Sequence, residues 1–359
     1  MKALTVIPKK ADSLSLSDID EPLESDGDVL VETLAVGVCG TDFEIVSGAY
    51  GWPPKGKDRL VLGHESLGRV LEVDDGVVRG DGEIKKGDLV VGIVRRPDPV
   101  PCHNCAIGEW DFCRNGLYTE RGIKEHDGYC SERYRISPNF AVKVDPSLGT
   151  LGVLLEPTSV VAKAWEQVMN IGNRAFFGPK KVVVTGAGPI GLLAALLGVQ
   201  KGLEVHVLDR VSQGIKPDLV AGIGAHYHDN PLRDVLIDGD TNVVLECTGV
   251  GELVFDAMEH LAPGGVVCLT GVSSGGRALQ VDAGALNRSM VLENEAVVGS
   301  VNANRRHYQA AADALAKADP AWLNRLITRK VPLDEYAQAF VKRDDDVKVV
   351  IEVSTDVRW

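Results

Sequence analysis

One segment constrains the fold of this chain more than any other, Gly186-Ala187-Gly188-Pro189-Ile190-Gly191. It follows a β-branched run at 181–185 and opens a helix-like segment at 189–201. Glycine at its three positions permits a tight turn, a close approach of the backbone to a pyrophosphate, and close packing of the helix on the sheet. The amino end of such a helix offers unpaired N–H groups to phosphate oxygens. The segment therefore predicts a dinucleotide site, formed by Gly186, Gly188, Pro189, Ile190 and Gly191.

The next predicted strand, 204–208, is followed by two residues that bear on the choice of cofactor. Asp209 would accept hydrogen bonds from an adenosine ribose and repel a 2′-phosphate, which favours NAD. Arg210 beside it could bind that phosphate instead, so we expect NAD to be preferred and NADP to be used as well. Thr248, which follows a predicted strand at 242–247, is included among the predicted cofactor-binding residues.

Strands and helices alternate from about residue 160 onwards, whereas the first 150 residues are rich in short β-like runs broken by glycine and proline. This predicts an α/β chain with a doubly wound parallel sheet and a separate β-rich domain. A final strand at 347–353 has no obvious place in the nucleotide-binding sheet, so we expect the tail to return to the first domain. The predicted domains are 1–157 with 303–359, and 158–302. Further predicted strands are 29–34, 67–73, 88–94, 140–144, 266–270 and 296–301, and further helices are 160–169, 252–261 and 308–317.

Length, charge and hydropathy narrow the class of protein. A chain of 359 residues with 45% hydrophobic and 25% charged residues is long enough for two domains. A net charge of −13 would repel nucleic acid and anionic membrane surfaces, so neither is expected as the main partner. No apolar run reaches the ~20 residues needed to span a bilayer. The first residues lack the long apolar stretch of a signal peptide, and we therefore expect a cytoplasmic protein.

A thiol, an imidazole and two carboxylates occur where a fold could bring them together. Cys39 lies in Cys-Gly-Thr-Asp, His64 and Glu65 lie in Gly-His-Glu, and Glu156 lies in Leu-Glu-Pro. Catalytic zinc takes three protein ligands of these types and leaves a fourth position open for water or substrate. Ligands scattered through a sequence are typical of an active site, so this set predicts a catalytic zinc.

A second set of cysteines is compact. Cys102, Cys105 and Cys113 form a C-x2-C-x7-C run. In a reducing compartment such a run indicates metal ligation before disulfide formation. Its compactness is typical of a structural zinc, which would stabilise the surrounding loop and take no part in the chemistry.

These motifs occur in an order that resembles a known family. The order is G-x-C-G-T-D at 37–42, G-H-E at 63–65, the cysteine run, L-E-P at 155–157 and G-x-G-P-x-G at 186–191. It resembles the zinc-dependent medium-chain dehydrogenases, which pair a GroES-like catalytic domain with a Rossmann domain, over almost the whole chain. Segments similar to the glucose (aldose) 1-dehydrogenase branch are 39–48, 61–65, 94–97, 107–113 and 298–302.

The resemblance implies roles for residues at matching positions. Cys39 and His64 would be ligands of the catalytic zinc, and Glu65 and Glu156 compete for the third protein ligand. Zinc would make the proton of an alcohol easier to remove near neutral pH. Thr41, two residues after Cys39, is similar to the family's hydroxyl that passes this proton towards solvent.

The branch also implies positions for sugar recognition. Glu120 and Asn302 would bind sugar hydroxyls, together with Thr41 and Glu156. Carboxylates and amides suit vicinal hydroxyls because each can make two hydrogen bonds.

The cysteine run departs from the family pattern, in which four cysteines hold a structural zinc. Only three are present here, and Asp98 stands near the position of the missing first cysteine. A carboxylate oxygen can bind zinc, so Asp98 is the expected fourth ligand, with His103 as the alternative.

The resemblance implies an enzyme that oxidises C1 of glucose or a related aldose to the lactone by hydride transfer to NAD(P). A polyol, threonine or simple alcohol dehydrogenase is one alternative, and a non-catalytic dinucleotide-sensing protein is another. A homodimer or homotetramer is expected, because the strand at 296–301 could extend a sheet across a dimer.

Overall fold

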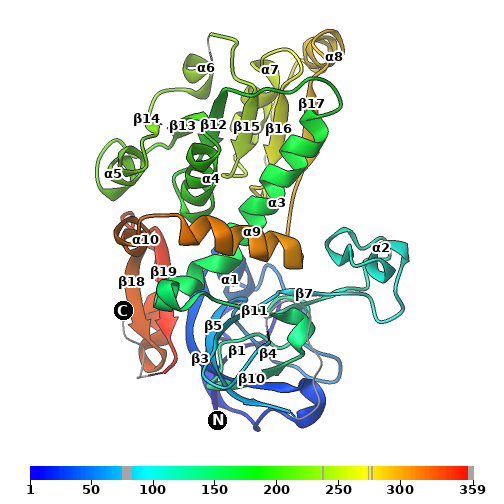
Figure 1. Ribbon diagram of the computed structural model, residues 1–359, viewed down its shortest axis with the longest axis vertical. Coiled ribbons are helices and arrows are strands. Elements are labelled where there is room, and N and C mark those ends of the chain that lie inside the picture. The colour runs from blue at the N-terminus through cyan, green and yellow to red at the C-terminus, as the bar shows by residue number, and fades with distance from the viewer. Residues whose placement is uncertain (75–82, 237, 274, 276–277, 355–359) are drawn as a thin grey trace. The chain divides into compact units, whose positions relative to one another are not determined.

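The computed structural model describes residues 1–74, 83–236, 238–273, 275 and 278–354. It divides into two compact units, of which the first comprises Met1–Ser159 with Asn302–Trp359 and the second comprises Val160–Val301. The predicted α/β class is confirmed, since a β-rich unit and a parallel sheet with helices are both present (Figure 1).

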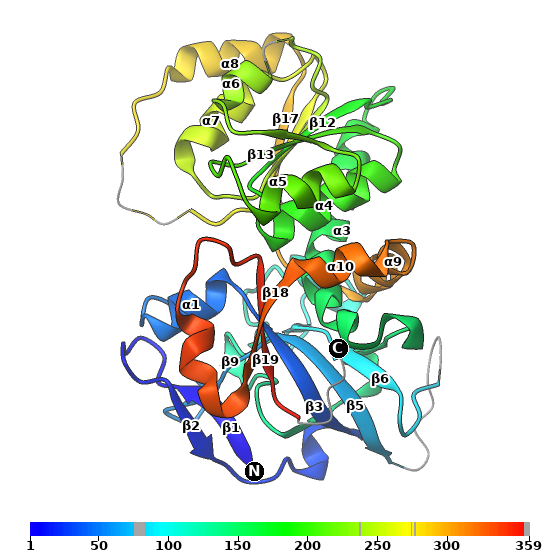
Figure 2. The same cartoon turned by 90° about the vertical axis from the view of Figure 1, so that its left-hand side faces the viewer.

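The first unit is built on a seven-stranded sheet (Figure 2). Its long strand β3 pairs with β5 along one edge, and β10 and β19 share the other edge. The strands are β3 (Val29–Val38), β5 (Glu65–Val73), β6 (Leu89–Gly92), β10 (Arg133–Ile136), β11 (Ala141–Lys143), β18 (Ile327–Pro332) and β19 (Lys348–Glu352).

The carboxyl-terminal segment completes this sheet. β19 lies antiparallel to β3, with Val350 opposite Gly37, and β18 lies parallel to β19. Val350 and Ile351 are buried, and Ile351 belongs to the same apolar core as Leu4 and Val31. The tail is therefore part of the core of the first unit.

Two small sheets and several helices complete the first unit. The sheets are β2 (Ser15–Asp18), β1 (Lys2–Val6) and β4 (Leu60–Val61), and β7 (Arg95–Arg96), β8 (Thr119–Arg121) and β9 (Glu125–His126). The α-helices are α1 (Gly40–Val46), α2 (His103–Ala106), α9 (Arg305–Ala316) and α10 (Pro320–Leu326). The 3₁₀ helices are η1 (Glu24–Asp26), η2 (Trp110–Phe112), η3 (Pro138–Phe140), η4 (Pro146–Leu154) and η5 (Leu333–Phe340). Helix α3 (Leu155–Gly172) begins in this unit and continues into the second.

The second unit is a six-stranded parallel sheet in the order β14-β13-β12-β15-β16-β17. The strands are β12 (Lys181–Thr185), β13 (Glu204–Leu208), β14 (His226–His228), β15 (Val243–Glu246), β16 (Val266–Leu269) and β17 (Ala296–Gly299). The helices between them are α4 (Pro189–Gln200), α5 (Ile215–Gly222), α6 (Leu232–Val235), α7 (Gly251–Glu259) and α8 (Ala283–Leu292). The central strands are apolar because helices cover both faces of a doubly wound sheet, as the fully buried Val183 and Val244 illustrate.

The structure differs from the predicted elements mainly at their ends. The strand predicted at 29–34 extends to Val38, and the helix predicted at 160–169 spans Leu155–Gly172. Strand β3 alternates in burial at its start and is fully buried from Thr33 onwards, so the alternating pattern that marks a strand ends before the strand does. Among the described residues, no helix is long and apolar enough to cross a membrane.

Replacing Ile351 with Ala tests the place of the tail in the core. The buried side chain is expected to leave a cavity that costs about 2–5 kcal/mol. The apparent melting temperature, followed by circular dichroism, should fall clearly. Val341→Ala is the control, because Val341 is 56% exposed and such a substitution changes stability by only about 0.5 kcal/mol. Equal melting temperatures for the two variants would contradict this role of the tail.

Candidate functional site

Three residues with different ligand chemistry meet in the first unit. Cys39 caps the amino end of α1, His64 precedes β5, and Glu65 is the first residue of that strand. The Cys39 sulfur lies 3.0 Å from Nε2 of His64. One ligand atom from each of Cys39, His64 and Glu65 lies within 4.8 Å of the others. A thiolate, an imidazole and a carboxylate at this spacing suit a zinc ion.

Asp42 holds both of the first two residues in place. Its Oδ2 accepts a hydrogen bond from the backbone N–H of Cys39 at 2.9 Å, and its Oδ1 lies 3.4 Å from Nδ1 of His64. The contact on Nδ1 orients the ring so that Nε2 faces the Cys39 sulfur, as an outer carboxylate does for a metal-binding histidine. Burial opposes protonation of His64, but the charges of Cys39 and Asp42 raise its pKa well above the usual range. The pocket therefore favours a cation at this point, which fits a metal.

Glu65 is held by a buried lysine from the end of the chain. Lys348, at the start of β19, places Nζ 2.8 Å and 2.5 Å from the two carboxylate oxygens. Both side chains are almost fully buried. A Cβ on Gly37 would lie only 2.1 Å from Oε2 of Glu65, so the glycine that opens the G-x-C-G-T-D motif leaves room for this carboxylate.

Sequence reasoning missed Asp42 and Lys348. Asp42 is the last residue of the G-x-C-G-T-D motif, so its place next to Cys39 and Thr41 could have indicated a role in the site. Lys348 is separated from Glu65 by 283 positions and is the first residue of an apolar strand, which is a position that surface lysines share.

Glu156, the other predicted third ligand, lies at the start of α3 and is buried. In the described part of the chain, the compact group contains Glu65 and does not contain Glu156. Burial raises the pKa of Glu156 to about 8, against the opposing effect of the charge on His64. The choice of third ligand stays a prediction.

Two of the four residues predicted to bind sugar, Glu120 and Asn302, are in direct contact. Nδ2 of Asn302 donates to Oε1 of Glu120 at 2.7 Å. The same oxygen accepts from Nε and Nη2 of Arg95 at 3.0 Å and 2.9 Å. The guanidinium of Arg95 also stacks on Tyr118, 3.8 Å from its ring centre. Oε2 of Glu120 makes no hydrogen bond with the described part of the chain, so this oxygen can accept from a ligand. Thr41 lies half-buried in the first turn of α1.

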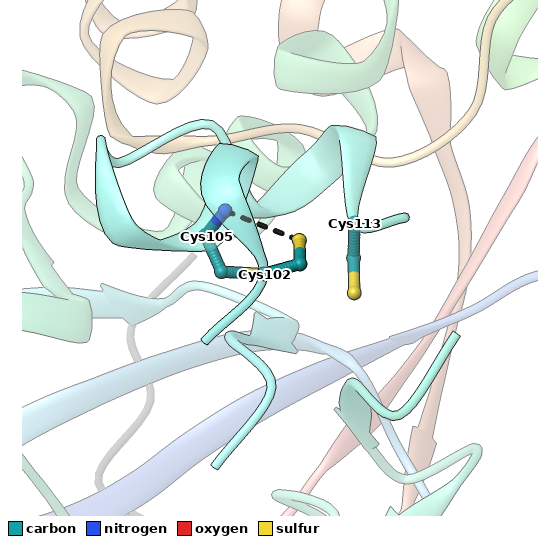
Figure 3. Close-up of side chains that lie close together, drawn as sticks. All are labelled: Cys102, Cys105 and Cys113. Atoms are coloured by element: carbon teal, nitrogen blue, oxygen red, sulfur yellow. Dashed lines mark hydrogen bonds between the residues drawn. The ribbon is translucent and has the colours of Figure 1, made fainter. Parts of the chain in front are cut away.

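The second cysteine set also comes together (Figure 3). Ligand atoms of Cys102, Cys105 and Cys113 lie within 4.8 Å of one another. The backbone N–H groups of Arg114 and Cys105 donate to the Cys102 sulfur at 3.3 Å and 3.5 Å and lower its pKa to about 6. A thiol that ionises this easily is ready to bind a metal.

Neither predicted fourth ligand belongs to this group. The carboxylate of Asp98 accepts from the backbone N–H of Val100 at 2.9 Å and from Nδ2 of Asn115 at 2.7 Å. His103 is exposed on α2. The role of Asp98 as a ligand stays a prediction, since its carboxylate is not part of the group of ligand atoms.

The glycine segment joins β12 to α4 in the second unit. Gly186 has a φ of +89°, and Gly188 caps α4, which has Pro189 and Ile190 in its first turn. A Cβ on Gly191 would lie 1.7 Å from the carbonyl oxygen of Gly186, so this position accepts only glycine. Thr248 lies against the turn, since a Cβ on Gly186 would come 3.0 Å from its methyl group.

Asp209 supports this turn from the end of β13. Its Oδ2 accepts from the backbone N–H of Ala187 at 2.7 Å and lies 3.3 Å from Nζ of Lys216. Arg210 beside it is exposed. The carboxylate predicted to bind ribose therefore also holds the glycine turn, and it is already paired with the ammonium group of Lys216.

Comparison with known proteins agrees with this geometry. The family described as "Alcohol dehydrogenase GroES-like domain" matches residues 25–146, and the family "Glucose dehydrogenase C-terminus" matches residues 149–353. The chain is 38% identical over 361 residues to a glucose 1-dehydrogenase of Methanocella arvoryzae, covering 98% of this chain and 99% of the relative. It is 40% identical over 360 residues to that of Thermoproteus tenax, covering 99% and 100%.

A solved structure extends the likeness to the fold. The glucose dehydrogenase of Haloferax mediterranei, in complex with NADP, zinc and gluconolactone, is 35% identical and superimposes with a TM-score of 0.89. The match covers 99% of this chain and 100% of that chain. The predicted pairing of a GroES-like domain with a Rossmann-like sheet is thus confirmed, and the chain belongs to the zinc-dependent medium-chain dehydrogenases, in their glucose 1-dehydrogenase branch.

Proposed function

We propose that the protein oxidises C1 of glucose or a related aldose to the lactone, with zinc as the metal and NAD or NADP as the hydride acceptor. One observation carries the proposal, namely the group of Cys39, His64 and Glu65 in a chain of this branch. When bound, zinc would supply a Lewis acid that makes the substrate hydroxyl easier to deprotonate.

The residues of the chain would prepare the site for this reaction. Cys39 and His64 hold the metal, and Asp42 fixes the orientation of the imidazole through its contact on Nδ1. Glu65 and Glu156 are the two candidates for the third protein ligand. Thr41, close in sequence to Cys39, would accept the hydroxyl proton and pass it to solvent.

Sugar recognition would rest on the pair of Glu120 and Asn302. Arg95 and Asn302 donate to Oε1 of Glu120, which leaves Oε2 to accept a hydrogen bond from a hydroxyl. A charged acceptor that is already oriented loses little entropy when the sugar binds. A simple alkyl alcohol would leave this buried polar group without its partner, which disfavours alcohols that lack neighbouring hydroxyls.

The cofactor would bind at the glycine turn of the second unit. The turn and the amino end of α4 suit a pyrophosphate. Asp209 favours the ribose of NAD, whereas Lys216 and Arg210 near it could pair with the 2′-phosphate of NADP. We therefore propose that both cofactors are used. From the sequence alone, we also propose that the protein is a homodimer or homotetramer and that it is located in the cytoplasm.

A substrate panel tests the proposed function. Zinc-loaded protein is offered glucose, galactose, xylose, sorbitol, threonine and ethanol with NAD and then with NADP, and reduced cofactor is followed by absorbance. We expect turnover on aldoses with formation of a lactone. Activity on non-aldoses alone would overturn the sugar assignment, and cofactor binding without any turnover would favour a dinucleotide sensor.

Cys39→Ser tests the metal site within the same assay. Removing a residue that only orients a metal ligand typically lowers metal affinity or activity by roughly 10–100-fold. Removing the thiolate ligand itself should therefore lower turnover by more than that. Zinc content by mass spectrometry should fall together with kcat. Binding of NAD(P) should be unchanged, because the glycine turn belongs to the other unit. Full activity in a folded Cys39→Ser protein would exclude this ligand.

Glu120→Gln tests sugar recognition. The amide keeps the shape but loses the charge that Arg95 and Asn302 face, so we expect the KM for glucose to rise about tenfold or more. Glu72→Gln is the matched control, because Glu72 is exposed on β5. KM and kcat for glucose are measured separately for both variants. An unchanged KM for Glu120→Gln would remove Glu120 from the substrate site.

Lys348→Met tests the buried ion pair. The substitution leaves the Glu65 carboxylate buried without its cation, which is expected to cost about 3–5 kcal/mol of stability. The double variant Lys348→Met with Glu65→Gln should recover part of this loss, since no buried charge remains unpaired. Thermal unfolding of the wild type, the two single variants and the double variant gives the interaction energy between Lys348 and Glu65. Additive losses would show that the two residues do not act as a pair.

A further inference from the structure

A cluster of three histidines and one glutamate lies on the sheet of the second unit, at positions that the sequence analysis did not single out. Glu204 and His206 belong to β13, and His226 and His228 belong to β14. The strands are parallel, with His206 opposite His226 and Leu208 opposite His228. Side chains two residues apart point to the same face of a strand, so all four residues share one face.

The side chains are in contact with one another. Nε2 of His206 lies 2.9 Å from Oε1 of Glu204, and Nδ1 of His206 lies 2.8 Å from Nε2 of His228. The ring centres of His206 and His226 are 4.9 Å apart. One ligand atom from each of Glu204, His206 and His226 lies within 4.8 Å of the others.

This cluster is separate from the dinucleotide site. Glu204 and His226 are the first residues of their strands, whereas the glycine turn and Asp209 follow the carboxyl ends of β12 and β13. At about 3.3 Å per residue, the five residues from Glu204 to Asp209 span roughly 16 Å. Glu204 and His226 therefore lie away from the proposed cofactor site, whereas His228 is the last residue of β14, where its carbonyl accepts from the backbone N–H of Asp209.

We propose that Glu204, His206 and His226 bind a divalent transition metal ion of the zinc type, with His228 orienting the ring of His206. Imidazole and carboxylate are ligands that Zn²⁺, Ni²⁺ and Cu²⁺ accept. Two ligand atoms bound tetrahedrally at about 2.0–2.1 Å lie roughly 3.3–3.4 Å apart. The 2.9 Å contact between His206 and Glu204 needs only a small adjustment to admit the ion.

His228 would act on the ion through His206. On metal binding, Nε2 of His206 would release the proton that it now donates to Glu204, and the ring would donate its Nδ1–H to Nε2 of His228. A histidine ligand whose second nitrogen donates to a neighbour is the usual arrangement at metal sites.

The surrounding charges do not oppose a cation. Glu204 contributes an acidic side chain to the cluster, 2.9 Å from Nε2 of His206. Lys181 on the neighbouring strand β12 is the nearby positive charge, and its Nζ lies 2.9 Å from Asp240 and 3.8 Å from Asp238. Asp229, next to His228, adds a further negative charge.

Bound metal would tie the edge of the sheet together. β14 is the edge strand of the sheet and, among the residues that the structure describes, pairs only with β13. The ion would link the two strands through side chains at their amino ends, while the backbone N–H of Asp209 donates to the His228 carbonyl at their carboxyl ends. An ion that binds only the folded state raises its stability, and the gain grows with metal concentration.

The test uses the protein with its zinc already loaded, so that the cysteine sites are filled. Isothermal titration with NiCl₂ at pH 7.5, and metal counting after gel filtration, should show one further equivalent per chain. His226→Ala should weaken this binding at least tenfold, and His206→Ala should abolish it. His228→Ala should weaken it about tenfold, as expected for an outer partner of a ligand. His260→Ala is the matched control, because His260 lies in the same unit but bonds to the carbonyl of Asp256.

Two further measurements make the outcome decisive. With Cu²⁺ as the probe, electron paramagnetic resonance should show two coupled imidazole nitrogens, and one of these couplings should be lost in His226→Ala. The apparent melting temperature should rise with added Ni²⁺ in the wild type and not in His226→Ala. Binding should weaken from pH 7.5 to 5.5, because protons compete for the imidazoles. The absence of an extra equivalent, or equal affinity in the wild type and His226→Ala, would overturn the proposal.

Discussion

The pairing of β19 with β3 is the interaction on which the first unit depends. It places a strand from the end of the chain against one that begins at residue 29, and it fills the edge that β10 leaves open. The same register brings Lys348 onto Glu65, next to Cys39 and His64. A backbone ladder thus determines the electrostatics of the candidate metal site, because the lysine arrives only if the last strand takes its place.

Acidic groups outnumber basic groups in the pocket around Cys39 and His64. The acidic side chains are those of Asp42, Glu65, Glu156 and Cys39, and all but Cys39 are almost fully buried. Lys348 neutralises one carboxylate, the pKa of Glu156 is raised, and the pKa of His64 is raised as well. Several buried acids together are costly unless cations compensate them. A divalent ion at Cys39 and His64 would supply the missing positive charge, so the pocket suits a metal in its electrostatics as well as in its donor atoms.

Local sequence patterns were sufficient for the architecture of the second unit. The glycine turn, the β-branched strand before it and the acidic residue after the next strand are all features of one short stretch, and each reflects a steric demand of the backbone. The candidate zinc ligands and the candidate sugar-binding residues Glu120 and Asn302 needed more, since these residues are scattered. Cys39 and His64 were predicted because residues 37–42 and 63–65 resemble known motifs, and Glu120 and Asn302 were predicted from the resemblance to the glucose 1-dehydrogenase branch. Physical reasoning on single residues would have left each of them as an ordinary core or loop residue.

The sequence by itself determined the fold class, the family and most of the candidate residues, because turn glycines and ligand motifs are local. Only the tertiary structure decided which acids meet which cations. Lys348 on Glu65, Asp42 on His64 and the bond of Asp98 to Asn115 each depend on strand register and loop path. The cluster of Glu204, His206 and His226 depends on them as well, because two strands contribute to it and their alignment makes neighbours of residues that are distant in sequence.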